Sequence, residues 1–175
     1  MVDIFGQEPI RALSWKEPYL SLMLHGKTET RTWNTNYRGL VLMCGSLAPY
    51  PFEVVNNKIS GSHQTNRIWE TLDYDSNFKT KYCGKAAAIG RLVDCRPMTK
   101  ADEDKCFVQY KEPWFEMKSN KNKITGIIKI TNKQKKLFCH IYEDVREIKP
   151  FDWKGSQGWG KVDQKIIDTL EFFGT

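Results

Sequence analysis

Short apolar runs separated by turn residues dominate the hydrophobic pattern of this chain, and they predict strands rather than long helices. One apolar run ends at Cys44, a run of small apolar residues fills 84–95, and an alternating run fills 137–148. Gly90 interrupts the second run, which predicts a bulge or a close approach of two backbones there. The pattern therefore indicates a sheet built from several short strands.

One clear helix is expected near the start of the chain, between Pro18 and Gly26. Its apolar face is formed by three residues at i, i+3 and i+4 spacing, which are Leu20, Met23 and Leu24. Proline suits the first helical position, and glycine can adopt the left-handed conformation that ends a helix. A capping box of Ser14 and Glu17 is the alternative start. We prefer a start at Pro18, because the earlier start would place this proline just inside the helix.

The segment 27–33 alternates strictly, with the sequence KTETRTW. If it is extended, Glu29, Arg31 and Trp33 lie on one face, with next-but-one side chains about 7 Å apart. Such a row can pair internally and still offer donors, an acceptor and a flat ring to a ligand. The same alternation also fits a strand face whose charges do no more than contact water.

Weaker signals predict the remaining elements. They are a loop or insertion at 47–66, a short helix or strand at 68–72, a short helix at 99–106, a hairpin whose basic turns at 119–123 and 132–136 flank 124–130, and a packing helix at 163–173. The lysines of the hairpin form a basic patch, although they also fit two loops that are merely solvated.

Composition indicates an ordered protein with a polyanionic partner. The 175 residues are 40% hydrophobic and 27% charged, which argues for one globular domain and against disorder. The net charge of +6 favours a polyanion, and an aromatic content of 13% suits base stacking as well as core packing. No apolar run could span a bilayer and no leader pattern is visible, so we expect a cytoplasmic protein without membrane contact.

Cysteine and histidine spacing gives no reason to expect a metal or another cofactor. The five cysteines are odd in number and include no Cys-x-x-Cys pair, so we expect reduced, buried thiols. The three histidines have no metal-ligand spacing to one another or to the cysteines.

Motifs at both ends of the chain resemble the ASCH domain family of the PUA-like superfamily. The first is ALSWKEPYLSLMLHGKTETRTWNTNYRG followed by an apolar strand, and the second is YEDVREIKPFDWKGSQGWGKV. The resemblance covers about residues 11–162, with inserts near 48–82 and 116–136. The segment from Pro18 to Arg31 is about two residues shorter than the family pattern. Ser46 is the only match to the polar end of the next strand.

The resemblance implies an α+β fold, a PUA-like mixed β-barrel with flanking short helices, as a single domain over 1–175. It also implies a pocket at the barrel mouth for single-stranded RNA, a nucleotide or a modified nucleoside. Glu29 would accept from a base amine, cationic side chains would contact phosphate, and aromatic rings would stack on bases. The candidate ligand-binding residues are Tyr19, Lys27, Glu29, Arg31, Trp33, Tyr37, Arg38, Ser46 and Lys154. Each aromatic side chain has core packing as its alternative role.

A second hypothesis is an enzyme, because small ASCH proteins that remove acyl groups from N4-acylated cytidines share the Lys-Thr-x-Glu/Thr-x-Arg strand. Lys27 would act as a base if its pKa were lowered, with Thr28 or Thr30 as the hydroxyl partner and Glu29 beside them. A protein-interaction module built on the two inserts is the third class.

Overall fold

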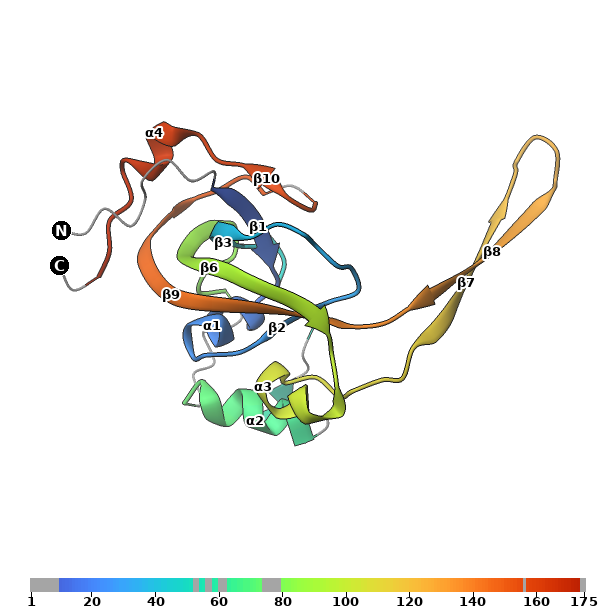
Figure 1. Cartoon of the computed structure of the whole chain (residues 1–175), viewed down its shortest axis with the longest axis horizontal. Helices are drawn as coiled ribbons and strands as arrows, with labels where there is room; N and C mark the ends of the chain where they lie inside the picture. Colours follow the sequence, from blue (N-terminus) through green and yellow to red (C-terminus); the bar gives the residue numbers. More distant parts are fainter. Residues whose placement is uncertain are drawn as a thin grey trace.

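A curled six-stranded mixed sheet, half a barrel in shape, forms the body of the protein in the computed structural model (Figure 1). The structure describes residues 10–51, 54–55, 58–59, 63–73, 80–155 and 157–173. In spatial order the strands are β10 (Gly160–Lys161), β1 (Arg11–Trp15), β3 (Gly39–Gly45), β6 (Lys85–Pro97), β9 (Phe138–Asp152) and β2 (Glu29–Arg31). β1 and β3 are parallel, whereas the other neighbouring pairs are antiparallel. The expected α+β fold is confirmed, whereas the expected mixed barrel is present as a curled mixed sheet that forms only half a barrel.

Short helices and two small sheets surround this body. The helices are α1 (Tyr19–Leu24), α2 (His63–Thr71), the 3₁₀ turn η2 (Lys100–Asp102), α3 (Glu103–Cys106) and α4 (Gln164–Ile167). The small sheets pair β4 (Val54–Val55) with β5 (Lys58–Ile59), and β7 (Trp114–Lys121) with β8 (Ile128–Lys135). The segment 68–72 is therefore mostly helix, and the short helix predicted at 99–106 is confirmed. Part of the expected insertion at 47–66 lies outside the described residues.

Two clusters of buried apolar side chains lie on opposite faces of β3, because successive strand residues point to opposite sides. Val41 and Met43 pack with Trp15 and α1, and Leu42 packs with Ile167 of α4. Gly90 of β6 lies where the pairing with β9 shifts register. This register shift confirms the predicted bulge, and a Cβ atom at Gly90 would lie 2.8 Å from the terminal methyl of Met43.

The hairpin forms, but its turn is not where the basic residues predicted it. Of the two predicted turns, residues 119–121 lie in β7 and 132–135 in β8, and the connection runs from Asn122 to Ile127, so it only partly overlaps the first. The Asn122 side chain accepts from the N–H groups of Ile124 and Thr125 at 2.9 and 3.1 Å. Gly126 takes the left-handed conformation, with φ of +68°. The Asn122 side chain and the left-handed Gly126 therefore locate the turn better than the apolar run 124–130 does.

The C-terminal helix is much shorter than the predicted 163–173. Asp163 caps α4 by accepting from the Lys165 N–H at 3.0 Å, and the helix ends at Ile167. Beyond it the chain extends along β9, where Phe172 forms a bridge with Ile148. Strand pairing therefore replaces the last turns that the helical spacing predicted.

Three of the five cysteines are buried, and all five are free. The buried ones are Cys44, Cys106 and Cys139, whereas Cys83 and Cys95 are half-buried. Among the residues that the structure describes, no three His, Cys, Asp or Glu side chains lie close enough together to hold a metal ion. No helix within the described ranges is long and apolar enough to cross a bilayer.

Candidate ligand-binding site

A left-handed glycine at the end of α1 directs Lys27 into the interior. Gly26 has φ of +81°, and the Lys27 N–H donates to the Leu22 carbonyl at 3.0 Å. This bond is the long one of a Schellman motif, so the predicted end of the helix is confirmed. The Thr28 N–H then donates to the Lys105 carbonyl at 2.8 Å, which ties the turn to α3. The backbone around Lys27 is thus fixed from two sides.

A buried carboxylate between two cations lies directly after this turn. Glu29 is 5% exposed, and its Oε2 lies 2.8 Å from Nζ of Lys27. Its other oxygen, Oε1, lies 2.7 Å from Nε of Arg31. Lys27 also donates to the Thr28 carbonyl at 3.0 Å. The alternation predicted one face for Glu29 and Arg31, and their contact shows that the strand places them so.

The two cations keep this carboxylate ionised despite its burial. Burial by itself raises the pKa of Glu29, but the attraction of Lys27 and Arg31 outweighs it and lowers the pKa below its ordinary value. Glu29 is therefore an acceptor and not a proton donor at neutral pH. A carboxylate offers about four acceptor positions, and the two cations occupy only two of them.

Aromatic rings form the walls around this charged group. The guanidinium of Arg31 lies 5.1 Å from the Trp15 ring centroid, and Nζ of Lys27 lies 5.5 Å from the Tyr19 ring centroid. Arg31 also donates to the Ser14 carbonyl at 2.9 Å. Burial raises the pKa of Tyr19 to about 12, so its hydroxyl stays protonated.

A pocket of about 770 Å³ opens above these residues. Its volume lies within the range of small-molecule sites. Its lining comes from β1, α1, β2, the start of β9 and the turn before β10. The lining residues are Leu13, Ser14, Trp15, Lys16, Tyr19, Lys27, Glu29, Thr30, Arg31, Thr32, Trp33, Ser46, Tyr50, Val108, Leu137, Gln157 and Gly158. We call it the charged pocket.

A second hollow, also about 770 Å³, continues from the charged pocket. Its lining residues are Arg11, Trp33, Asn34, Thr35, Asn36, Tyr37, Gly158 and Trp159. Trp33 and Gly158 line both hollows. The Trp159 ring lies 5.8 Å from that of Trp33 and 5.0 Å from that of Tyr37, and the Arg11 guanidinium lies 4.6 Å from the Tyr37 ring. We call it the aromatic groove.

His140 holds Trp33 at the boundary between the two hollows. It is fully buried opposite Glu29 in the β2–β9 pairing, and its ring packs edge-on against Trp33 at 4.8 Å. Its Nε2 lies 3.1 Å from the Trp33 carbonyl. Because a carbonyl only accepts, Nε2 carries the proton. Burial lowers the pKa of His140, so the ring is neutral at pH 7.

The structure brings most of the sequence-predicted residues together. Seven line the charged pocket, which are Tyr19, Lys27, Glu29, Thr30, Arg31, Trp33 and Ser46. Tyr37 lines the aromatic groove. Arg38 and Lys154 line neither hollow. Arg38 instead donates to the Thr35 and Tyr37 carbonyls and lies 3.3 Å from Asp94.

Sequence reasoning missed four side chains of the site. Trp15 and Arg11 belong to β1, and Trp159 lies next to β10. These positions meet because β1 pairs with both β3 and β10. The fourth, His140, occupies an alternating strand whose partner could not be known from spacing. Gly158 also lines both hollows.

Comparison with known proteins leaves the functional argument to this geometry. No family model matches the chain, and no curated protein matches it either.

Proposed function

We propose that this protein binds a nucleotide or a single-stranded RNA segment, with one base in the charged pocket. We further propose that its half-barrel is an ASCH-type fold of the PUA-like superfamily. The observation that carries the proposal is the buried, ionised Glu29 at the base of an open pocket that leads into an aromatic groove. The motifs at both ends of the chain support the fold assignment.

Glu29 and Arg31 together suit the edge of a base that carries an exocyclic amine. The free acceptor positions of Glu29 can take hydrogen bonds from such an amine. Arg31 and Lys27 supply N–H donors next to them for the ring nitrogen or carbonyl of the same base. Cytosine and adenine offer a donor beside an acceptor, whereas uracil offers one N–H between two carbonyls. We therefore expect uridine nucleotides to bind most weakly.

The aromatic groove suits the neighbouring nucleotide. Trp33, Tyr37 and Trp159 offer ring surface for stacking, which is worth about 1–3 kcal/mol for each base. Arg11 lies at the same place and can neutralise a phosphate. Affinity should therefore fall with added salt, because each neutralised phosphate releases counterions.

Titration with the four nucleoside 5′-monophosphates, followed by tryptophan fluorescence, tests the proposal. Trp15 and Trp33 line the charged pocket and report occupancy. Glu29→Gln should weaken cytidine or adenosine monophosphate by about 5- to 150-fold, which corresponds to about 1–3 kcal/mol for a bidentate base contact. The matched control is Asp94→Asn, an exposed carboxylate that lines neither hollow.

Trp159→Leu provides a second variant that leaves the buried ion pair intact. It should weaken a dinucleotide more than a mononucleotide, because its ring lines only the aromatic groove. Near-ultraviolet circular dichroism establishes that each variant is folded. A folded wild-type protein that binds none of the four nucleotides at low salt would refute the proposal.

Hydrolysis of N4-acylated cytidines is the second candidate, because Lys27, Glu29 and Thr30 line one pocket. The geometry at Lys27 weighs against it. Nζ donates to both Glu29 and the Thr28 carbonyl, so two acceptors of the protein itself already engage this group. Incubation with N4-acetylcytidine, followed by chromatography for cytidine, decides between the two. Turnover that Lys27→Met abolishes would establish the enzyme.

A further inference from the structure

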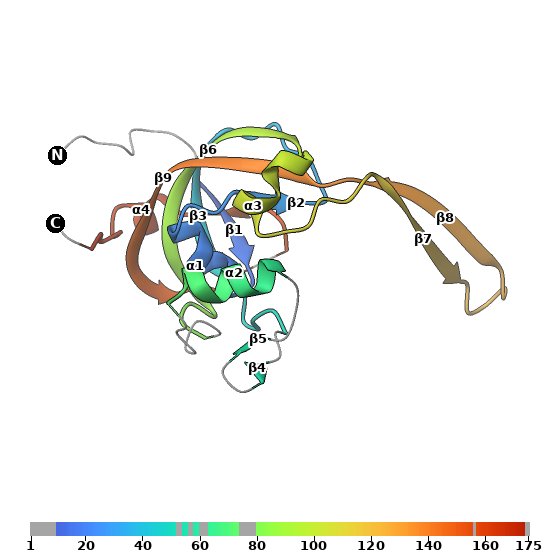
Figure 2. The ribbon, with the colours of Figure 1, turned by 90° about the horizontal axis from the view of Figure 1, so that it is seen from below.

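The net positive charge of the protein resides in one projecting hairpin. The segment 111–136 contains eight lysines and two glutamates, a net charge of +6, which equals the net charge of the whole chain. The remaining residues are therefore neutral in sum. We call this segment 111–136, which comprises β7, β8, the turn between them and the flanking residues, the arm. In two perpendicular views it extends away from the sheet (Figures 1 and 2).

The strand register gives the arm two different faces, because directly paired residues of antiparallel strands point to the same side. One face carries the pairs Trp114–Lys135, Glu116–Lys133, Lys118–Thr131 and Asn120–Lys129. The other carries Phe115–Gln134, Met117–Asn132, Ser119–Ile130 and Lys121–Ile128. The first face thus holds four lysines and one glutamate, and we call it the basic face. The second carries four apolar side chains among its eight residues, and we call it the apolar face.

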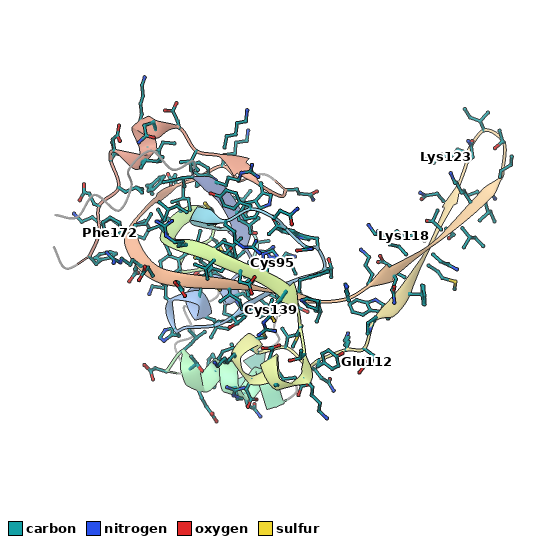
Figure 3. All side chains as sticks on the ribbon, viewed as in Figure 1. Cys95, Glu112, Lys118, Lys123, Cys139 and Phe172 are labelled. Carbon is teal, nitrogen blue, oxygen red and sulfur yellow. The ribbon has the colours of Figure 1, made fainter. Side chains whose placement is uncertain are left out.

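Ionic contacts within the arm leave most of this charge available. Glu116 lies 3.4 Å from Lys135 and 3.9 Å from Lys118, so one carboxylate serves two ammonium groups. The Lys118 side chain is nevertheless 68% exposed, and Lys129 and Lys133 are exposed. Figure 3 shows Lys118 and Lys123 on the projecting ribbon, far from the labelled Cys95 and Cys139 of the body. The basic face is therefore exposed to solvent from Lys118 to the turn.

The arm also joins the body at the rim of the charged pocket. Leu137 follows the arm directly and lines that pocket, as does Val108 just before it. Phe138, the next residue, pairs with Arg31. A polynucleotide with one nucleobase in the charged pocket would therefore leave the pocket close to the point where the arm joins the body.

We propose that the arm binds the sugar–phosphate backbone of a single-stranded polynucleotide through its basic face. The occupant is inferred from charge complementarity, since a regular polyanion matches a row of ammonium groups along a two-stranded ribbon. The eight residues of each strand span about 26 Å at about 3.3 Å per residue. The arm accordingly contacts several nucleotides, and it extends the proposed binding in the pocket from one base to a polymer.

The test compares two triple variants that each lose three positive charges. The arm variant is Lys118→Gln, Lys129→Gln and Lys133→Gln. The body control is Lys85→Gln, Lys100→Gln and Lys165→Gln, which are exposed and line neither hollow. Fluorescence anisotropy with a labelled 12-nucleotide RNA and with a dinucleotide is measured between 50 and 200 mM salt, a range in which the Debye length is about 10 Å.

The arm variant should reduce the slope of log K against log salt for the 12-mer by about 2, at about 0.7 for each lost phosphate contact. The body control should keep the wild-type slope, and dinucleotide affinity should be the same in all three proteins. The wild type could bind the 12-mer tightly and the arm variant weakly, while none of the three proteins binds the dinucleotide. That result would support the arm proposal and reject the pocket proposal. Equal slopes in the arm variant and the wild type would overturn the arm proposal.

The apolar face offers a rival occupant, a second copy of the chain. Sedimentation of the wild type and of Phe115→Ser/Ile130→Ser tests it, since both side chains are more than half exposed at 68% and 64%. A dimer that this double variant dissociates, together with wild-type RNA affinity in the arm lysine variant, would show that the arm is a self-association surface and that the proposal is wrong.

Discussion

Replacing Lys27 by methionine tests how much the buried ion pair of Lys27 and Glu29 contributes to the free energy of unfolding. The Lys27 side chain is 1% exposed and that of Glu29 is 7% exposed. Methionine keeps an unbranched apolar chain of similar length but removes the ammonium group that lies 2.8 Å from the carboxylate. Glu29 then keeps only Arg31 as a charged partner.

The expected loss in the free energy of unfolding follows from this geometry. Removing one partner of a buried ion pair costs about 3–5 kcal/mol, because an uncompensated charge stays in the interior. Since Arg31 remains, we expect Lys27→Met to lie near the lower end, at about 3 kcal/mol. Glu29→Gln leaves the buried ammonium with the Thr28 carbonyl as its acceptor, so we expect a loss nearer 5 kcal/mol.

The double variant Lys27→Met/Glu29→Gln should lose less than the sum of the two single changes. It leaves only Arg31, whose side chain is 22% exposed and can reach water. Residues in direct contact commonly show interaction energies of about 0.5–3 kcal/mol in such cycles. Non-additivity at the upper end of that range would confirm that the two charges stabilise each other.

Urea unfolding with linear extrapolation measures these differences. The matched control is Lys149→Met, which removes the cation of an exposed ion pair with Glu171, 59% and 63% exposed. Exposed pairs are worth about 0–1 kcal/mol, so the control should lose no more than that. A Lys27→Met variant as stable as this control would refute the burial argument.

Two further predictions concern stability. Because burial lowers the pKa of His140, the unfolded chain binds a proton more readily, and the free energy of unfolding should fall as pH drops below about 6.5. Urea unfolding between pH 7.5 and 5.5 should show a smaller fall in His140→Gln than in the wild type. An equal fall in both proteins would contradict this assignment. Gly45→Ala should lower the free energy of unfolding by about 3 kcal/mol or more, because its Cβ would lie 1.8 Å from the Tyr82 carbonyl oxygen; a thermal midpoint equal to that of the wild type would contradict this.

The sequence predicted best those features that depend on neighbours in the chain. Gly26 ends α1 and Glu29 contacts Arg31, because helix ends and strand alternation follow from residues only a few positions apart. The aromatic groove could not be predicted in this way. Arg11 and Trp159 lie at opposite ends of the chain and meet only through the pairing of β1 with β10.

The two wrong boundaries have local and non-local causes. The hairpin turn lies at 122–127 because the Asn122 side chain accepts a backbone N–H there and Gly126 takes the left-handed conformation. The prediction from basic and apolar runs did not use these two turn signals. The C-terminal helix stopped early because the edge of β9 offered Phe172 a strand partner. Tertiary hydrogen bonds thus outweighed a helical spacing that was correct as a pattern.

The separation of charges between body and arm assigns different parts of binding to each in the proposed function. In the body, Glu29 lies within about 3 Å of both Lys27 and Arg31, and the residues outside the arm are neutral in sum, so the body exerts little attraction on a polyanion beyond the Debye length of about 8 Å. The arm, with its net charge of +6, is then the main source of the field that steers a polyanion toward the protein, a contribution that acts on association and weakens with salt. The contacts of Glu29 and Arg31 are desolvated, and contacts of this kind act on dissociation and on the choice of base. The arm would therefore govern how fast a strand is captured, and the pocket would govern which base holds it there.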